Sequence, residues 1–240
     1  MTCRHGGGIR NGRNGMDIKE IFGHFEKAGC CTFATVDENG YPVTRIAHFF
    51  AFDGEGLYFR TMRVKPFYRH LSETGRVSAC GLVTASAAIT LGADGMPVEE
   101  PGYFIRVTGD CREISFDALS RKAETEPMFM LGVKDILRYP DMTTFCLWRF
   151  KGEIYDYDYE MTARDHKLQR TFFAFGGFER PFRGLRIGPD CIGCGTCMAN
   201  CTFMAISFGE DGVYRIDPGR CDACGTCRHN CPAGAIEVFQ

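Results

Sequence analysis

Eight of the fourteen cysteines in this 240-residue chain fall into two short runs that share one spacing. The first run, CIGCGTCMANC, extends from Cys191 to Cys201, and the second, CDACGTCRHNC, extends from Cys221 to Cys231. Each run reads C-x2-C-x2-C-x3-C, and nine of the sixteen positions in 191–206 are identical in 221–236. Cysteine thiolates are soft ligands that bind iron–sulfur clusters and zinc. The doubled run therefore predicts two metal centres.

The spacing favours iron–sulfur clusters over the alternative of two all-cysteine zinc sites. Structural zinc sites usually pair C-x2-C units across longer spacers. Over residues 186–240, the chain resembles a bacterial-type ferredoxin with two 4Fe–4S clusters, in which the fourth cysteine of each run binds the cluster of the other run. The resemblance implies one cluster on Cys191, Cys194, Cys197 and Cys231, and a second on Cys221, Cys224, Cys227 and Cys201. We also expect a short helix to start at each fourth cysteine.

Composition and charge narrow the class of protein. Hydrophobic residues make up 45% of the chain, which is enough to bury a core, and the net charge is −2, which gives no argument for binding nucleic acid. No apolar run reaches the roughly 18 residues of a membrane span, and the first fifteen residues lack the apolar centre of a signal peptide. We expect no membrane or nucleic-acid partner. Cysteines at metal-ligand spacing without a secretion signal indicate a reducing compartment, the cytoplasm.

The part of the chain before the cysteine runs reads as strands with inserted helices. Apolar periodicity predicts helices over 17–28, 64–75 and 116–138. Alternating or continuous apolar segments predict about six strands, over 31–36, 41–52, 57–61, 76–84, 102–114 and 143–157. Most connections are short and turn-like, as in the DENG sequence at 37–40. The pattern is typical of a mainly β, α+β fold built on an antiparallel barrel.

Residues 17–160 resemble the FMN-binding split barrel of the pyridoxamine 5′-phosphate oxidase-like superfamily. The run from FATVDENG to RVSACG, the strand YFIRVTGDCREI and the closing strand FCLWRF carry the likeness. The resemblance implies that Arg45, Arg60, Thr61 and Lys65 hold the phosphate and ribityl chain of FMN. It also implies that Ile46, Ala47 and His48 flank the flavin ring, and that the chain forms a homodimer with FMN at the subunit interface. The alternative is that these basic residues face solvent and that His48 only packs.

The sequence divides into four parts. We expect a flexible leader over 1–15, a split barrel over 16–160, an aromatic-rich connector over 161–185 and a ferredoxin domain over 186–240. The connector holds Phe172, Phe173, Phe175, Phe178 and Phe182. Such a segment either packs the ferredoxin domain against a barrel or completes the core of the barrel itself.

These predictions combine into an FMN-dependent iron–sulfur oxidoreductase. Clusters pass single electrons and FMN exchanges one or two, so a one-electron relay can end in a two-electron reduction. Electrons would enter from an external donor such as a ferredoxin, cross two 4Fe–4S clusters to FMN, and reduce a small organic acceptor. One alternative is a non-enzymatic electron-transfer or redox adaptor protein. Another is a split barrel that binds haem or a different ligand.

Overall fold

The computed structural model describes residues 16–83, 90–91, 95–98, 102–158, 167–178 and 184–239. These residues divide into two compact units. The first unit takes in the described residues through Gly81 together with Arg106–Gly152 and Phe173–Phe178, and the second takes in those within Leu82–Ile105, Glu153–Phe172 and Glu179–Gln240. The predicted leader over 1–15 lies outside the described residues. No described helix is long and apolar enough to cross a membrane.

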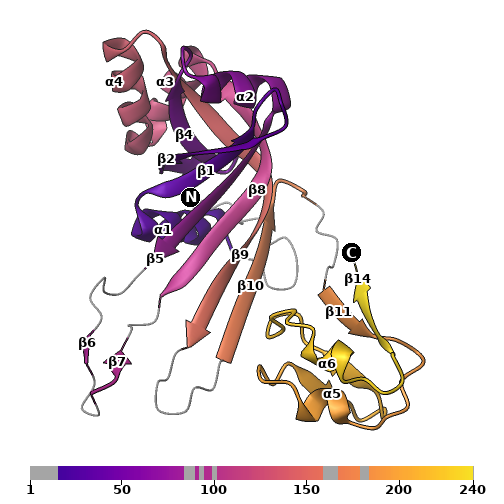
Figure 1. The fold of residues 1–240 in the computed structure, drawn as a ribbon. Coiled ribbons are helices and arrows are strands. Elements are labelled where there is room, and N and C mark those ends of the chain that lie inside the picture. The colour runs from indigo at the N-terminus through magenta and orange to yellow at the C-terminus, as the bar shows by residue number, and fades with distance from the viewer. Residues whose placement is uncertain are drawn as a thin grey trace, which may run out of the picture. The chain divides into compact units, whose positions relative to one another are not determined.

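The first unit is built on one sheet of eight strands (Figure 1). The strands of this sheet are β1 (Cys31–Val36), β2 (Pro42–Ala47), β3 (Phe49–Asp53), β4 (Gly56–Met62), β5 (Arg76–Val83), β8 (Tyr103–Ile114), β9 (Met142–Asp158) and β10 (Lys167–Phe175). Residues 82–83, 103–105, 153–158 and 167–172 of these strands are counted in the second unit. They follow the order β2-β1-β5-β8-β9-β4-β3, with β10 paired to β9, and β1–β2, β1–β5, β3–β4 and β4–β9 are antiparallel pairs. The predicted mainly β fold with inserted helices is confirmed.

The sheet has two strands more than the six segments that were predicted as strands. Residues 41–52 form two strands, β2 and β3, which only His48 separates. These two strands lie at opposite ends of the strand order, so the sheet must curve to bring its ends together. The other additional strand, β10, lies within the range predicted to be a connector.

Helices of the first unit begin and end at capping residues. Helix α1 (Ile18–Ala28) has a capping box in which Asp17 accepts a bond from the Glu20 amide. Helix α2 (Pro66–Thr74) starts with a proline and ends at Gly75, whose φ is +62°. The segment 116–138 is helical as predicted, in three pieces: α3 (Phe116–Thr125), the 3-10 helix η1 (Pro127–Phe129) and α4 (Met130–Arg138). Figure 1 labels α3 and α4. Pro127 explains the break, because proline has no backbone N–H to continue the helix.

Phenylalanines fill both faces of the first unit's sheet. On one face the ring of Phe33 lies 5.0 Å from that of Phe49 and 5.1 Å from that of Phe59. On the other face Phe50 and Tyr58 pack edge-to-face against Phe129 under α3 and α4. Each fully buried side chain of this size stabilises the fold by about 1.5–3 kcal/mol. The core therefore fixes which strand residues point inward.

The connector phenylalanines Phe173 and Phe175 belong to that same unit. Phe173 is buried and meets Phe150 edge-to-face, while Phe175 stacks on Phe150 with ring centres 5.2 Å apart. These two side chains thus complete the core of the first unit. Phe182 lies outside the described residues.

The second unit holds the cysteine runs between short elements. Two antiparallel pairs, β11 (Gly184–Ile187) with β14 (Ile236–Phe239) and β12 (Ile206–Phe208) with β13 (Tyr214–Ile216), frame α5 (Thr196–Ala199) and α6 (Thr226–His229). A further pair joins β6 (Thr90–Leu91) to β7 (Pro97–Val98). Each helix follows a left-handed glycine and ends before the fourth cysteine. The expectation that the helix starts at the fourth cysteine was wrong, because the glycine two residues before the third cysteine already starts it.

Candidate iron–sulfur and flavin sites

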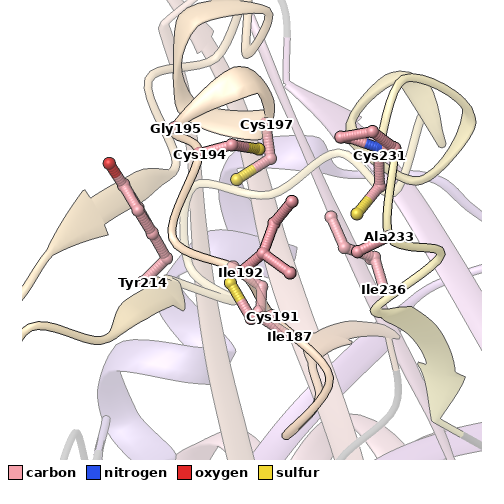
Figure 2. Close-up of a pocket in the computed structure, with 11 residues that line it drawn as sticks. Ile187, Cys191, Ile192, Cys194, Gly195, Cys197, Tyr214, Cys231, Ala233 and Ile236 are labelled. Carbon is pink, nitrogen blue, oxygen red and sulfur yellow. The ribbon is translucent and has the colours of Figure 1, made fainter.

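Four cysteines line one cavity of the second unit. They are Cys191, Cys194 and Cys197 from the first run and Cys231 from the second. Figure 2 shows the four sulfurs around a common space, with Ile192 and Ile236 beside them. The chain thus brings together the three leading cysteines of one run and the last cysteine of the other.

A second cavity has the reciprocal composition. Its walls include Cys221, Cys224 and Cys227 from the second run and Cys201 from the first. Within the described residues, no three Cys, His, Asp or Glu side chains are gathered to hold a single metal ion. The eight cysteines of the two runs instead line the walls of the two cavities, four to each.

Left-handed backbone makes these tight loops possible. Gly193 and Gly195 have φ of +71° and +74°, a conformation open to glycine at no steric cost. The second run has Gly225 at +81°, but Ala223 takes the place of Gly193 and still adopts +58°. In return, the Ala223 amide donates to Cys221 Sγ at 3.3 Å. Backbone N–H groups aimed at cysteine sulfur are the contacts that stabilise sulfur bound to a cluster.

Burial affects the protonation of these thiols. It raises the pKa of Cys197, and it raises the pKa of Cys227 to about 11. Burial also raises the pKa of Cys221, which the positive charge of Arg170 opposes. Ligation requires thiolates, so binding at these sites must release protons.

In the first unit, Arg45 has an unsatisfied polar atom. Arg45 lies opposite Phe33 in the β1–β2 register, and its guanidinium is 4.1 Å from the centre of the Phe67 ring. Its Nε is buried and has no hydrogen-bond partner among the residues that the structure describes. Burial lowers the pKa of Arg45. An anion bound here would satisfy the Nε and offset the burial of the charge.

Arg60, by contrast, is already paired. Its Nη1 donates to Asp135 on α4, its Nη2 lies 3.2 Å from His48 Nε2, and its guanidinium packs 4.6 Å from the centre of the Phe50 ring. Burial and the neighbouring charge of Arg60 lower the pKa of His48. His48 therefore accepts a bond from Arg60 as a neutral imidazole at neutral pH.

The remaining predicted flavin residues differ in how deeply they are buried. Thr61 is buried on the face of β4 that carries Phe59, and strand alternation points Arg60 to the opposite face. Lys65 is exposed directly before α2, and its amide donates to the Met62 carbonyl at 3.0 Å. On β2, Ile46 is 69% exposed and Ala47 is half-buried. The structure therefore brings His48 to Arg60, and Arg45 to the helix that Lys65 precedes.

Sequence reasoning missed the acidic partners of these cations. Asp135 reaches Arg60 from 75 positions along the chain. Glu113 accepts bonds from Arg63, Thr143 and Tyr68 at 2.7, 2.6 and 3.0 Å. No local spacing signals either contact, because both depend on which strands and helices meet.

Comparison with known families matches both parts of the chain. Residues 18–168, well over half of the chain, match the family model described as pyridoxamine 5′-phosphate oxidase. Residues 190–235 match the model described as a 4Fe-4S dicluster domain.

Individual relatives cover only parts of the chain. A 39-residue segment is 51% identical to a component of the Na⁺-translocating ferredoxin:NAD⁺ oxidoreductase complex of Acetobacterium woodii; it spans 16% of this chain and 11% of that protein. Among solved structures, a NimC/NimA family protein from Clostridium acetobutylicum is 14% identical with a TM-score of 0.42, over 65% of this chain and 91% of that one. The haem storage protein HutZ from Vibrio cholerae is 17% identical with a TM-score of 0.39, over 55% and 86%.

Proposed function

Because the chain belongs to the pyridoxamine 5′-phosphate oxidase family and carries a 4Fe-4S dicluster domain, we propose that it is an FMN-dependent iron–sulfur oxidoreductase. At the coarser level, the two matched domains make it a redox protein suited to electron transfer. When bound, two 4Fe–4S clusters would supply one-electron transfer and FMN would exchange one or two electrons with a small organic acceptor. The residues of the chain would bind and orient these groups.

The single observation that carries the proposal is the pair of cavities with four cysteines each. Their composition supports crossed ligation, with one site on Cys191, Cys194, Cys197 and Cys231 and the other on Cys221, Cys224, Cys227 and Cys201. The doubled C-x2-C-x2-C-x3-C spacing of these ligands favours iron–sulfur clusters over single zinc ions, because structural zinc sites usually pair C-x2-C units across longer spacers.

For FMN, the unsatisfied Nε of Arg45 is the strongest support. We assign Arg45, Thr61 and Lys65 to the phosphate and ribityl chain, because a dianionic group would satisfy the buried guanidinium. The resemblance also puts Arg60 on the phosphate, but its ion pair with Asp135 favours a different task. Arg60 would orient His48 beside the ring, with Ile46 and Ala47 along its edge.

Partners follow from the same chemistry. An external ferredoxin-like protein would supply electrons to the clusters. A homodimer would cover exposed apolar side chains of the first unit, including Tyr41, Ile46 and Val64, which are 69%, 69% and 72% exposed. Both partners are part of the proposal.

Anaerobic purification followed by iron, sulfide and flavin quantitation tests the proposal. We expect iron and acid-labile sulfide for two 4Fe–4S clusters per chain, and FMN in the acid-released fraction. Reduction by a ferredoxin should then bleach the cluster absorbance and the flavin absorbance in turn. Zinc in place of iron, haem in place of FMN, or reduced clusters that leave the flavin oxidised would overturn it.

A further inference from the structure

A charged cluster within the second unit lies directly beside one of the two cysteine cavities. The backbone amide of Arg170 on β10 donates to the carbonyl of Gly219 at 2.7 Å, two residues before Cys221. Its Nη2 lies 3.8 Å from Oδ1 of Asp222, the residue after Cys221. The Tyr155 hydroxyl also donates to this oxygen. Strands β9 and β10 thus hold the loop that carries Cys221 by three contacts.

This arrangement is largely buried. The side chains of Arg170 and Glu153 are 17% and 11% exposed, with Nε and Oε2 3.5 Å apart. The guanidinium lies 4.3 Å from the centre of the Tyr155 ring. Charges shielded from water interact more strongly than charges at the surface. One buried cation therefore faces two carboxylates, Asp222 and Glu153.

At the equivalent position of the repeat, the other cavity is lined by an apolar side chain. Asp222 lines the second cavity, whereas Ile192, thirty residues earlier in the repeat, lines the first. The two runs share the same cysteine spacing. Their cavities nevertheless differ in charge at this position, because one has a carboxylate where the other has an isoleucine. A charge next to a cluster ligand alters reduction because each reduction adds one negative charge to the cluster.

We propose that Arg170 is a positioning residue that raises the reduction potential of the cluster bound by Cys221, Cys224, Cys227 and Cys201. It does so by offsetting the charges of Asp222 and Glu153, and by holding Asp222 in a fixed place beside Cys221. This inference rests on the proposed function, because it requires two clusters. The affected step is the addition of one electron, with no bond formed or broken.

The test is a redox titration of the whole protein, followed by electron paramagnetic resonance, for the wild type, Arg170→Gln, Arg170→Lys and Asp222→Asn. Arg170→Gln should lower the midpoint potential of one cluster. The equilibrium constant for its one-electron reduction should fall roughly threefold to tenfold, and a tenfold change corresponds to about 59 mV. Asp222→Asn should raise the same midpoint, and Arg170→Lys should retain most of the wild-type value. Ile192→Asp should lower the other midpoint, which assigns each signal to its site.

Arg186→Gln is the matched control, because it removes one cation from the same unit. Arg186 is 55% exposed and pairs with Glu237 at 2.9 Å, so solvent screens its charge and neither midpoint should move. If Arg170→Gln and Asp222→Asn both assemble two clusters and neither midpoint potential moves, the inference is overturned and the proposed function stands. The same holds if the midpoint potentials of both clusters move by the same amount in each variant. If Arg170→Gln assembles no cluster, opposite shifts in Asp222→Asn and Ile192→Asp still decide it. Failure to find two clusters in the wild type would instead overturn the proposed function.

Discussion

The cysteine cavities and the basic residues of the barrel are both candidate cofactor sites, but they draw on the sequence in different ways. Each cavity takes three of its four cysteines from within seven consecutive residues and the fourth from a copy of the same run. The barrel's candidates come from β2, β4, His48 between β2 and β3, and Lys65 directly before α2, and the ion-pair partner of Arg60 comes from α4. A local motif fixes the first kind of site, whereas the curvature and pairing of a whole sheet fix the second.

Removing a cysteine should have the largest effect. Cys231→Ala should abolish one cluster and about half of the bound iron, although Cys231 lies in the run that supplies three ligands to the other cavity. Iron quantitation and electron paramagnetic resonance on anaerobic protein measure the loss. Adding Cys191→Ala should cost no further iron, whereas adding Cys221→Ala should remove the remainder.

Cys80→Ala is the matched control, because Cys80 is an exposed cysteine outside both runs. It should leave both clusters in place. Equal iron loss on adding Cys191→Ala or Cys221→Ala to Cys231→Ala would contradict crossed ligation. It would also remove the contrast between the two kinds of site, since neither cavity would then act as a unit.

This contrast explains what could be predicted from the sequence. The spacing of the two runs marks eight of the fourteen cysteines as candidate ligands, because ligands two or three residues apart lie on one loop, whereas the crossed grouping was implied by the ferredoxin resemblance. The capped helix α1 and the strand β1 were equally readable from local patterns. The break between β2 and β3 at His48 could not be predicted, because the sequence of 41–52 reads as one continuous strand. In the structure, Phe49, Phe50 and Ala51 after the break are all buried.

The parts that could not be predicted depend on meetings between distant elements. Strand β10 looked like a connector because nothing in its sequence says that β9 continues as its partner. Arg45 and Arg60 looked alike, as two cations on neighbouring predicted strands. Only the fold shows that Arg45 has a buried Nε with no partner in the described part of the chain, and that Arg60 has an ion pair with Asp135.

The difference between those two arginines gives the second prediction. Arg45→Met should weaken FMN binding roughly 10- to 100-fold, because a hydrogen bond to a charged group contributes about 1.5–3 kcal/mol and each 1.4 kcal/mol is about tenfold. Fluorescence quenching during titration of flavin-free protein gives the dissociation constant. Arg60→Met should change FMN affinity less, and should lower the free energy of unfolding by leaving Asp135 unpaired.

Arg76→Met serves as the control for charge alone, since Arg76 is exposed at the start of β5. It should leave FMN affinity unchanged. If Arg60→Met weakened FMN binding more than Arg45→Met, the buried Nε would not mark the phosphate site. The assignment of Arg60 to His48 would then be wrong as well.

The smallest effect concerns Glu113, which links β8 to Arg63 and Tyr68 near the start of α2 and to Thr143 on β9. Burial acts to raise the pKa of Glu113, but the bonds from Thr143, Arg63 and Tyr68 lower it overall. A carboxylate with a lowered pKa in the folded state stabilises the fold above its unfolded-state pKa, about 4.3, and this stabilisation is lost as the pH falls through the folded-state value. Glu113→Gln should therefore reduce the free energy of unfolding by roughly 1–2 kcal/mol at neutral pH. The gap to wild type should shrink below about pH 4.3.

Urea unfolding followed by the fluorescence of Trp148, the single tryptophan, measures this gap at neutral and acidic pH. Glu73→Gln, an exposed carboxylate on α2, is the control and should have no effect at either pH. Iron content at neutral pH should be the same in all three proteins, because Glu113 belongs to the first unit and the cysteine runs belong to the second. A gap independent of pH would mean that Glu113 stabilises the barrel by packing, and that its bonds to Arg63, Tyr68 and Thr143 contribute little as a charged network.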